Sequence, residues 1–451
     1  MPGNLSVAEL DAAITAGEVD TVVVAVPDAQ GRLVGKRVSA RMWRDVVLPH
    51  GAEACNYLLS VDVDLNTVDG YAMSSWETGY GDMVLAPDLS TLRRIPWQPG
   101  AALVMSDLQW EDGRAVVPSP RSILNRQRER LAERDLVAYA ATELEFIVFD
   151  DSFREAWRKG YRDLATSTDY NVDYNLLATT RMEPLLRDIR NGMEAAGMYC
   201  EGVKGECNLG QQEIGFRYNE ALATADDHTI YKNGAKEIAD QHGKALTFMA
   251  KFNEREGNSC HIHLSVRSSD GEPVMAGDGA HGFSPLMEHW IAGVLATLRE
   301  FTLLYAPTIN SYKRYAKGSF APTGVAWGLD NRTCALRVVG HGQGLRVENR
   351  VPGGDVNPYL AISAIIAGGL HGIENELTLE DPTTGNAYTS GVDTLPTTLR
   401  AAAALFSESS IARSAFGDEV VEHYLNQARI EVEAFDAAVT DWERVRGFER
   451  L

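Results

Sequence analysis

Two carboxylates inside an apolar run most constrain what this chain can fold into. Glu143 and Glu145 lie in the sequence ATELEFIVFD, which is rich in β-branched and aromatic residues. Such a run predicts a strand, and side chains alternate between the two faces of a strand, so both carboxylates share one face. Taken alone, the pattern is also typical of an amphipathic strand whose charged face meets water.

The same spacing recurs twice further along the chain. His261 and His263 alternate in SCHIHLSV, and Arg346, Glu348 and Arg350 alternate in LRVENRV. Three strands that carry acidic, imidazole and guanidinium groups on one face favour a concave sheet around divalent metal and phosphate. The alternative is a set of amphipathic strands whose charged faces meet water. This alternative readily explains a single pair, but it explains three pairs with both signs of charge less well.

Length, charge and cysteine content limit the class of protein and its partners. The chain has 451 residues, which predicts two domains or one large decorated domain. A formal net charge of −21 argues against nucleic acid or an anionic membrane as the main partner. Five cysteines without C-x-x-C spacing favour a reducing cytoplasm over a disulfide framework. The sequence shows neither a signal-peptide pattern nor an apolar stretch of the roughly 18 residues that span a bilayer.

Local patterns predict a domain boundary near residue 110, giving domains 1–110 and 111–451. In the first domain, we expect a helix at 5–17, strands at 21–26 and 32–38, and further short strands to about 108. In the second, we expect strands at 136–149, within 200–218 and at 261–267, and helices at 122–134, 181–197, 226–250, 284–303 and 397–445. The segment 305–324 has little periodicity and is expected to be a functional loop.

A second acidic motif adds candidates for a metal site. Glu206 and Glu213 flank Gly210 in GECNLGQQEIGFRY, where a turn could bring both carboxylates together, although a solvated loop explains this segment alone. The combined candidates are Glu143, Glu145, Glu206, Glu213, Glu348 and His261. Mostly oxygen ligands suit Mg²⁺ or Mn²⁺ better than Zn²⁺. Clustered carboxylates raise each other's pKa, so we expect this cluster to be either well solvated or loaded with metal.

A cationic constellation follows between residues 313 and 350. Its members are Lys313, Arg314, Arg332, Arg337, Arg346 and Arg350. Arginine holds phosphate or carboxylate in a bidentate fork, and the apolar, glycine-rich flanks favour a cleft over an ordinary surface. Divalent metal together with several arginines is the usual apparatus for phosphoryl transfer. No G-x-x-x-x-G-K-[ST] motif occurs, which excludes a P-loop enzyme.

These motifs resemble those of the bacterial-type glutamine synthetases over nearly the whole chain. They are YGDMVLAPDLST at 80–91, TELEF at 142–146, GECNLGQQE at 205–213, GNSCHIHLS at 257–265, NSYKR at 310–314, NRTCALR at 331–337, RVENR at 346–350 and NPYLA at 357–361. The resemblance implies an α+β fold with an N-terminal β-grasp domain and a catalytic half-barrel, a curved antiparallel sheet flanked by helices. It also implies a homo-oligomer, a dodecamer of two stacked hexameric rings with active sites between subunits. The implied reaction is ATP-dependent ligation through a γ-glutamyl phosphate.

The resemblance also implies roles for individual positions. Two to three Mg²⁺ or Mn²⁺ ions are expected, the first held by Glu145, Glu206 and Glu213 and the second by Glu143, His261 and Glu348. Glutamate is expected to contact Gly257, His261, Arg314 and Arg350. ATP is expected to contact Tyr218, His263, Ser265, Arg337 and Arg346. The expected catalytic residues are Arg332 and Arg337 at the transferring phosphoryl group, Glu206, and Asp82, which would face the amine site of a neighbouring subunit.

The chain departs from the family pattern where ammonium binds. The flap that carries a glutamate in true glutamine synthetases reads GSFAP at 318–322, which places Phe320 at that position. The F-D-G-S-S motif is absent, and its aspartate has no clean counterpart among Asp62, Asp64 and Asp69; Asp62 and Asp64 are our candidates for the amine pocket. The tyrosine that is adenylylated in some relatives is also absent, so this regulation is not expected.

A phenyl ring in place of a carboxylate would weaken an ammonium pocket and tolerate a carbon chain. The pattern is therefore similar to that of the γ-glutamyl-amine ligases of the family, with ethanolamine favoured as the acceptor. Glu206 or an aspartate of the neighbouring subunit would deprotonate the amine. The alternatives are a polyamine ligase (putrescine, spermidine or spermine), an aromatic-amine ligase, an ammonia-using glutamine synthetase and a catalytically silent relative. The complete set of metal and phosphoryl positions argues against a silent relative.

Overall fold

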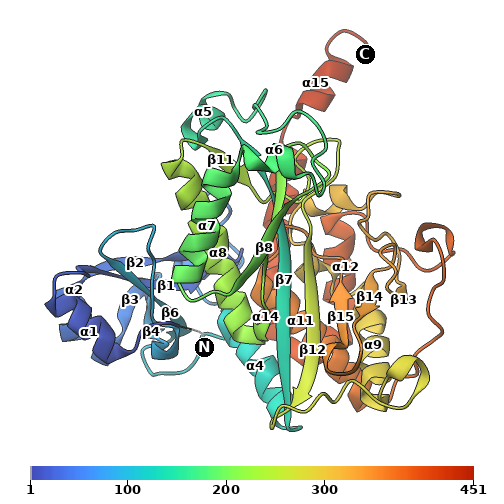
Figure 1. Ribbon diagram of the computed structural model, residues 1–451, viewed down its shortest axis with the longest axis horizontal. Coiled ribbons are helices and arrows are strands. Elements are labelled where there is room, and N and C mark those ends of the chain that lie inside the picture. The colour runs from blue at the N-terminus through green and yellow to red at the C-terminus, as the bar shows by residue number, and fades with distance from the viewer. Residues whose placement is uncertain (1–2) are drawn as a thin grey trace.

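The computed structural model describes residues 3–451, which form two sheets surrounded by helices (Figure 1). The smaller sheet contains β1 (Thr21–Pro27), β2 (Leu33–Ser39), β3 (Ala52–Cys55), β4 (Asp82–Pro87), β5 (Arg93–Arg94) and β6 (Ala101–Gln109). Its strand order is β2-β1-β6-β4-β3, with β1 parallel to β6 and β5 paired to β6. Helix α1 (Val7–Thr15) begins with a capping box between Ser6 and Glu9.

The larger sheet curls into a half-barrel. Its strands are β7 (Leu136–Phe149), β8 (Cys200–Gly205), β9 (Gln211–Phe216), β10 (Asn219–Glu220), β11 (Ala245–Thr247), β12 (Cys260–Ser268), β13 (Trp327–Leu329), β14 (Leu336–Val339) and β15 (Arg346–Asn349). The order is β13-β14-β15-β12-β7-β9-β8, and within this sheet β13 and β14 pair in parallel whereas the other described pairs are antiparallel. The long strands β7 and β12 lie side by side at its centre (Figure 1). The α+β class and the curled half-barrel are thus confirmed.

Helices cover the half-barrel and form the C-terminal part of the chain. They are α4 (Pro120–Ala132), α5 (Phe153–Arg158), α6 (Leu176–Thr180), α7 (Glu183–Ala195), α8 (Ala221–Gln241), α9 (Pro285–Thr297), α10 (Thr302–Tyr305), α11 (Pro358–Glu374), α12 (Leu399–Glu408), α13 (Ser410–Phe416), α14 (Asp418–Ala437) and α15 (Asp441–Gly447). Helices α4 and α8 pack on β7, while α11 packs against α9. A Cβ atom on Gly372 would lie 1.9 Å from the carbonyl oxygen of His289, so α9 and α11 require glycine at this crossing.

Several expected elements differ in the structure. The helix expected at 226–250 is wrong at its C-terminal end, because α8 stops at Gln241, Gly243 adopts φ +66 and β11 follows. The helix expected at 284–303 is divided into α9 and α10. Short helices α2 (Ala40–Met42) and α3 (Leu48–His50), joined by a π-helical segment, were not expected. The boundary near 110 stays a prediction, and no helix within 3–451 is long and apolar enough to cross a membrane.

A buried arginine ties the smaller sheet to the helices of the half-barrel. Arg121, fully buried on α4, donates to Asp107 at 2.6 Å, to Asp88 at 2.9 Å and to Asp226 of α8 at 3.0 Å. The hydroxyl of Tyr359 on α11 also donates to Asp226, at 2.7 Å. The network therefore joins the turn after β4 to β6, α4, α8 and α11, and each buried charge in it has a partner.

Arg121→Ala is expected to destabilise the fold by about 3–5 kcal/mol, because it leaves the buried carboxylate of Asp226 without its cation. Thermal denaturation should show a clearly lower melting temperature. Arg114→Ala is the matched control, since Arg114 pairs with Asp112 at the surface and its loss should change stability little. Equal melting temperatures for the two variants would contradict this account of the network.

Candidate active site

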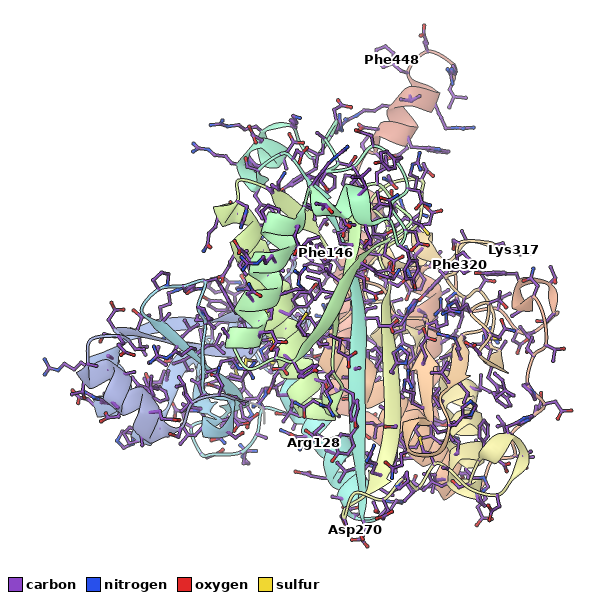
Figure 2. All side chains as sticks on the ribbon, viewed as in Figure 1. Arg128, Phe146, Asp270, Lys317, Phe320 and Phe448 are labelled. Carbon is purple, nitrogen blue, oxygen red and sulfur yellow. The ribbon has the colours of Figure 1, made fainter. Side chains whose placement is uncertain are left out.

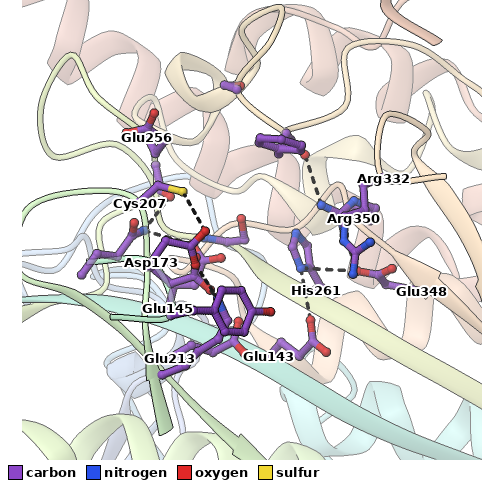
Figure 3. Close-up of a pocket in the computed structure, with 18 of the residues that line it drawn as sticks. Glu143, Glu145, Asp173, Cys207, Glu213, Glu256, His261, Arg332, Glu348 and Arg350 are labelled. Carbon is purple, nitrogen blue, oxygen red and sulfur yellow. Dashed lines mark hydrogen bonds and ion pairs between the residues drawn. The ribbon is translucent and has the colours of Figure 1, made fainter. Parts of the chain in front are cut away.

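Strand register brings the acidic and imidazole side chains together. In the antiparallel pairs, His261 of β12 lies opposite Glu143 of β7, and Glu145 of β7 lies opposite Glu213 of β9. His263 likewise lies opposite Glu348 of β15. Because side chains alternate along each strand, this register gathers the residues on one face of the half-barrel. Figure 3 shows Glu143, Glu145, Glu213, His261 and Glu348 of this set.

The first group of potential metal ligands is made of three carboxylates. One oxygen each from Glu145, Glu206 and Glu213 lies within 4.8 Å of the other two. Glu206 follows β8 in a turn where Gly210 adopts φ +68, and a Cβ atom there would lie 2.5 Å from a backbone oxygen. Gln211 donates to Glu145 at 3.1 Å, as the backbone of the loop before β12 does at 2.7 Å. The turn and these donors hold the carboxylates in place.

The second group lies around Glu143. Ligand atoms of Glu143, His263 and Glu348 lie within 4.8 Å of one another. Nδ1 of His261, the imidazole expected as a ligand, lies 3.3 Å from Glu143 and 3.4 Å from Glu348. Burial and the nearby charge of Arg350 together lower the pKa of His261 to about 4, so its ring is neutral as metal binding requires. Both histidines thus adjoin the cluster, and the role of His261 stays a prediction.

The charges of this cluster fit a divalent cation. Burial, together with the charges of Glu143, Glu145 and Glu206, raises the pKa of Glu213 to about 9. Burial and the charge of Glu206 likewise raise the pKa of Glu145. A hard divalent cation would offset this repulsion, and a set of carboxylates with one or two imidazoles is the donor chemistry that Mg²⁺ and Mn²⁺ accept.

Arginines line the opposite wall of the cavity. Glu348 is fully buried and accepts from Arg337 at 2.8 Å and from Arg350 at 2.5 Å. Arg332 also lines the cavity and is exposed. Arg314 instead donates to the backbone oxygens of residues 350 and 351 and does not line the cavity. Its proposed contact with glutamate therefore stays a prediction, as does that of Gly257, which does line the cavity.

A neighbouring cavity of about 550 Å³ adjoins the metal ligands. The expected ATP-binding residues that line it are Tyr218, His263, Ser265 and Arg346. Arg337, also expected to contact ATP, lines the first cavity instead. Glu143 and Glu213 border both cavities, so a nucleotide in one would place its phosphates beside the metal ligands of the other.

The flap residue Phe320 lines the first cavity, and Figure 2 labels it close to Lys317, which directly precedes the flap. Its side chain is 57% exposed and its backbone adopts φ +58, a strained region for an aromatic residue. Arg350 donates to its carbonyl oxygen at 3.4 Å. The flap therefore presents an apolar ring at the cavity and is tied to the arginine wall by a long hydrogen bond.

Other expected residues lie outside both cavities of this chain. Asp82 begins β4 in the smaller sheet, and Asp62 accepts from Asn66 in a nearby loop. Burial raises the pKa of Glu431 on α14, and the nearby charges of Asp62 and Asp64 contribute to this rise. Lys313, from the cationic constellation, lies over the ring of Phe435. The amine-site roles of the three aspartates depend on a neighbouring subunit and stay predictions.

Sequence reasoning missed one end of the first cavity. The unanticipated lining residues at this end include Asp173, Tyr174, Lys204, Cys207, Gln211 and Glu256. Lys204 precedes Glu206 by two positions and pairs with Glu213 in strand register, so strand periodicity could have identified it. The loop 170–175 has no periodic pattern, and nothing in its sequence signals that it folds over this cavity.

Comparisons with known proteins agree with this geometry. Residues 118–446 match the glutamine synthetase catalytic domain family. The chain is 62% identical to the gamma-glutamylethanolamide synthetase of Streptomyces coelicolor, over 99% of this chain and 96% of that protein. It is 38% identical to a glutamate–isopropylamine ligase of a Pseudomonas species, over 95% of each. It is 32% identical to the gamma-glutamylputrescine synthetase of Escherichia coli, over 94% of this chain and 90% of that protein.

Solved structures show the same fold. A GmaS–ADP complex superposes with a TM-score of 0.86 at 27% identity, covering 98% of this chain and 99% of the other. Ligand-free GmaS superposes with a TM-score of 0.84 at 26% identity, covering 97% and 98%. With its half-barrel, its paired carboxylate groups and these relatives, the chain belongs to the glutamine synthetase family.

Proposed function

We propose that this protein ligates the γ-carboxylate of L-glutamate to an organic amine, with ethanolamine favoured, at the expense of ATP. The observation that carries the proposal is an exposed phenyl ring, that of Phe320, beside a complete set of carboxylates and arginines. The acidic centre suits phosphoryl transfer, whereas the apolar flap suits a carbon-bearing acceptor better than ammonium. The high identity to a gamma-glutamylethanolamide synthetase supports the choice of amine.

Different residues of the cavity would bind metal, stabilise the transferring phosphoryl group and accept the proton of the amine. Two to three Mg²⁺ or Mn²⁺ ions, bound at the carboxylates, would offset phosphate charge and polarise the phosphoryl group. Arg332 and Arg337 would neutralise the charge that develops as the glutamate γ-carboxylate attacks the terminal phosphate. Glu206, or Asp82 of a neighbouring subunit, would then accept a proton from the attacking amine, and phosphate would leave as the amide forms.

We also propose a homo-oligomer, a dodecamer with active sites between subunits. The domain of residues 1–110 would supply Asp82, together with Asp62 and Asp64, to the domain of residues 111–451 in the next subunit. Helix α15 projects from the body with Phe448 near its tip, and Trp442, Val445 and Phe448 are each more than half exposed (Figure 2). An apolar stripe of this kind is typical of a contact surface. Mass photometry should detect twelve chains, and a monomer would contradict the proposal.

The test of the function is phosphate release from ATP with Mg²⁺ and glutamate across a panel of acceptors. Ammonium, ethanolamine, putrescine, spermine and an aromatic amine cover the alternatives. Turnover with ethanolamine and little with ammonium supports the proposal. Turnover with ammonium alone would identify a glutamine synthetase, and inactivity with every amine would contradict the enzyme assignment.

Phe320→Glu is expected to move acceptor preference toward ammonium. A carboxylate at this position would attract a small cation and disfavour an apolar chain, so the ratio of kcat/KM for ammonium to that for ethanolamine should rise by about tenfold or more. Phe320→Leu is the control, because it keeps an apolar side chain and should keep the wild-type preference. An unchanged ratio in Phe320→Glu would show that the flap residue does not select the acceptor.

A further inference from the structure

The end of the cavity near Asp173 already binds a primary ammonium group, that of Lys204. Nζ of Lys204 lies 3.2 Å from a carboxylate oxygen of Asp173 and forms an ion pair with Glu206. It also lies 4.3 Å from the centre of the Tyr174 ring, a cation–π contact. Two carboxylates and an aromatic face are the groups that recognise an alkylammonium ion, and here they surround a side chain of the protein itself.

The loop that carries these groups is seated firmly on β8. The backbone N–H of Tyr174 donates to the carbonyl oxygen of Gly205 at 3.3 Å. A Cβ atom on Gly205 would lie 2.4 Å from the backbone oxygen of Val172, so the close approach of the loop depends on glycine. Asp173 is therefore held beside Lys204 by the backbone as well as by the ion pair.

Both carboxylate oxygens of Asp173 contact another side chain. One oxygen faces Lys204, and the other lies 3.6 Å from the Sγ atom of Cys207. Glu206 is likewise paired to Lys204 and belongs to the first group of potential metal ligands. The negative charge at this end of the cavity is thus offset by the protein, and a second ammonium would meet the cation of Lys204.

The end of the first cavity near Asp173 does not border the neighbouring cavity, which is the proposed ATP site. The two cavities meet at Glu143 and Glu213, whereas Asp173, Tyr174 and Lys204 border only the first. Figure 3 shows Asp173 and Cys207 on one side of the pocket and Arg350 and Glu348 on the other. An amine that attacks an acyl phosphate must approach away from the departing phosphate, so the tail of the acceptor would extend toward this end.

We propose that Lys204 is a specificity-determining residue that restricts the acceptor to monoamines with a short neutral or hydroxylated tail. This inference rests on the proposed ligase function. The fixed ammonium of Lys204 repels the distal ammonium of a diamine or polyamine and occupies Asp173, the carboxylate that would bind it. A hydroxyl group carries no charge, and it can hydrogen-bond to Asp173 beside Lys204 without repulsion.

Lys204→Met tests the proposal because it removes the charge and keeps an unbranched side chain. With saturating ATP, Mg²⁺ and glutamate, the ratio of kcat/KM for putrescine to that for ethanolamine should rise by about tenfold, which corresponds to about 1.4 kcal/mol. Lys204→Arg keeps the positive charge and should keep the wild-type ratio. Using a ratio cancels any general effect of the substitution on metal binding, because both acceptors use the same centre.

A second substitution identifies the group that the diamine would contact. The double variant Lys204→Met with Asp173→Asn should lose the gain for putrescine, because the uncovered carboxylate is gone. An unchanged ratio in Lys204→Met, or an equal rise in Lys204→Arg, would overturn the inference while leaving the ligase function intact. Absence of glutamate-dependent ligation in the wild-type protein with every amine would instead refute the proposed function.

Discussion

Glu143→Ala is expected to lower the rate of glutamate-dependent ADP release by about a thousandfold. Glu143 lies 2.9 Å from His263 and 3.3 Å from His261, and it borders both cavities. Loss of the Glu143 carboxylate would remove one ligand from the second group of potential metal ligands. Fewer ligands would then remain beside Glu348 to hold a cation. Steady-state assays over a range of Mg²⁺ concentrations would measure the effect on both rate and metal requirement.

A surface glutamate provides the control for this prediction. Glu133 follows α4, is exposed and borders neither cavity, so Glu133→Ala should retain wild-type activity. Melting temperatures of both variants would separate a catalytic defect from unfolding. Full activity in folded Glu143→Ala protein would refute the assignment of this residue as a metal ligand.

Arg332→Ala is expected to lower kcat by about a thousandfold, because arginines at a transferring phosphoryl group contribute effects of this size. Arg337 and Arg350 already pair with Glu348, whereas Arg332 is exposed at the cavity wall and available to a substrate anion. The loss should fall on kcat more than on the KM for glutamate, since the charge it stabilises develops in the transition state.

The lysine variant refines the prediction for Arg332. Arg332→Lys keeps the charge but loses the bidentate fork, so its kcat should lie between those of the wild type and Arg332→Ala. Rapid-quench measurement of ATP cleavage would assign the defect to the chemical step. A change in KM alone would place Arg332 in substrate binding and contradict its role at the phosphoryl group.

The centre of the site could be predicted from the sequence because side chains alternate between the two faces of a strand, so their positions follow from their spacing. The strand at 136–149 has the expected bounds, and alternation placed Glu143 and Glu145 on one face. The register between strands then follows from burying the opposite, apolar face, which explains why Glu143 meets His261 and Glu145 meets Glu213.

The remaining features depend on contacts between distant segments. The loop 170–175 reaches the cavity through its fit on Gly205, which no local pattern encodes. Lys204 can be placed on the correct face from periodicity, but its ion pair with Asp173 requires that loop. The end of the helix expected to extend to 250 is different: Gly243 is exposed and adopts a left-handed conformation, so a local stop signal was overlooked rather than a distant contact.

The most direct test is mass spectrometry of a reaction with ATP, Mg²⁺, ethanolamine and glutamate labelled with ¹⁸O in both γ-carboxylate oxygens. If a carboxylate oxygen attacks the terminal phosphate of ATP and the amine then displaces phosphate, the label divides between the two products. The account predicts γ-glutamylethanolamide with one ¹⁸O and inorganic phosphate with one ¹⁸O. Unlabelled phosphate, or ADP formation without the amide, would contradict it.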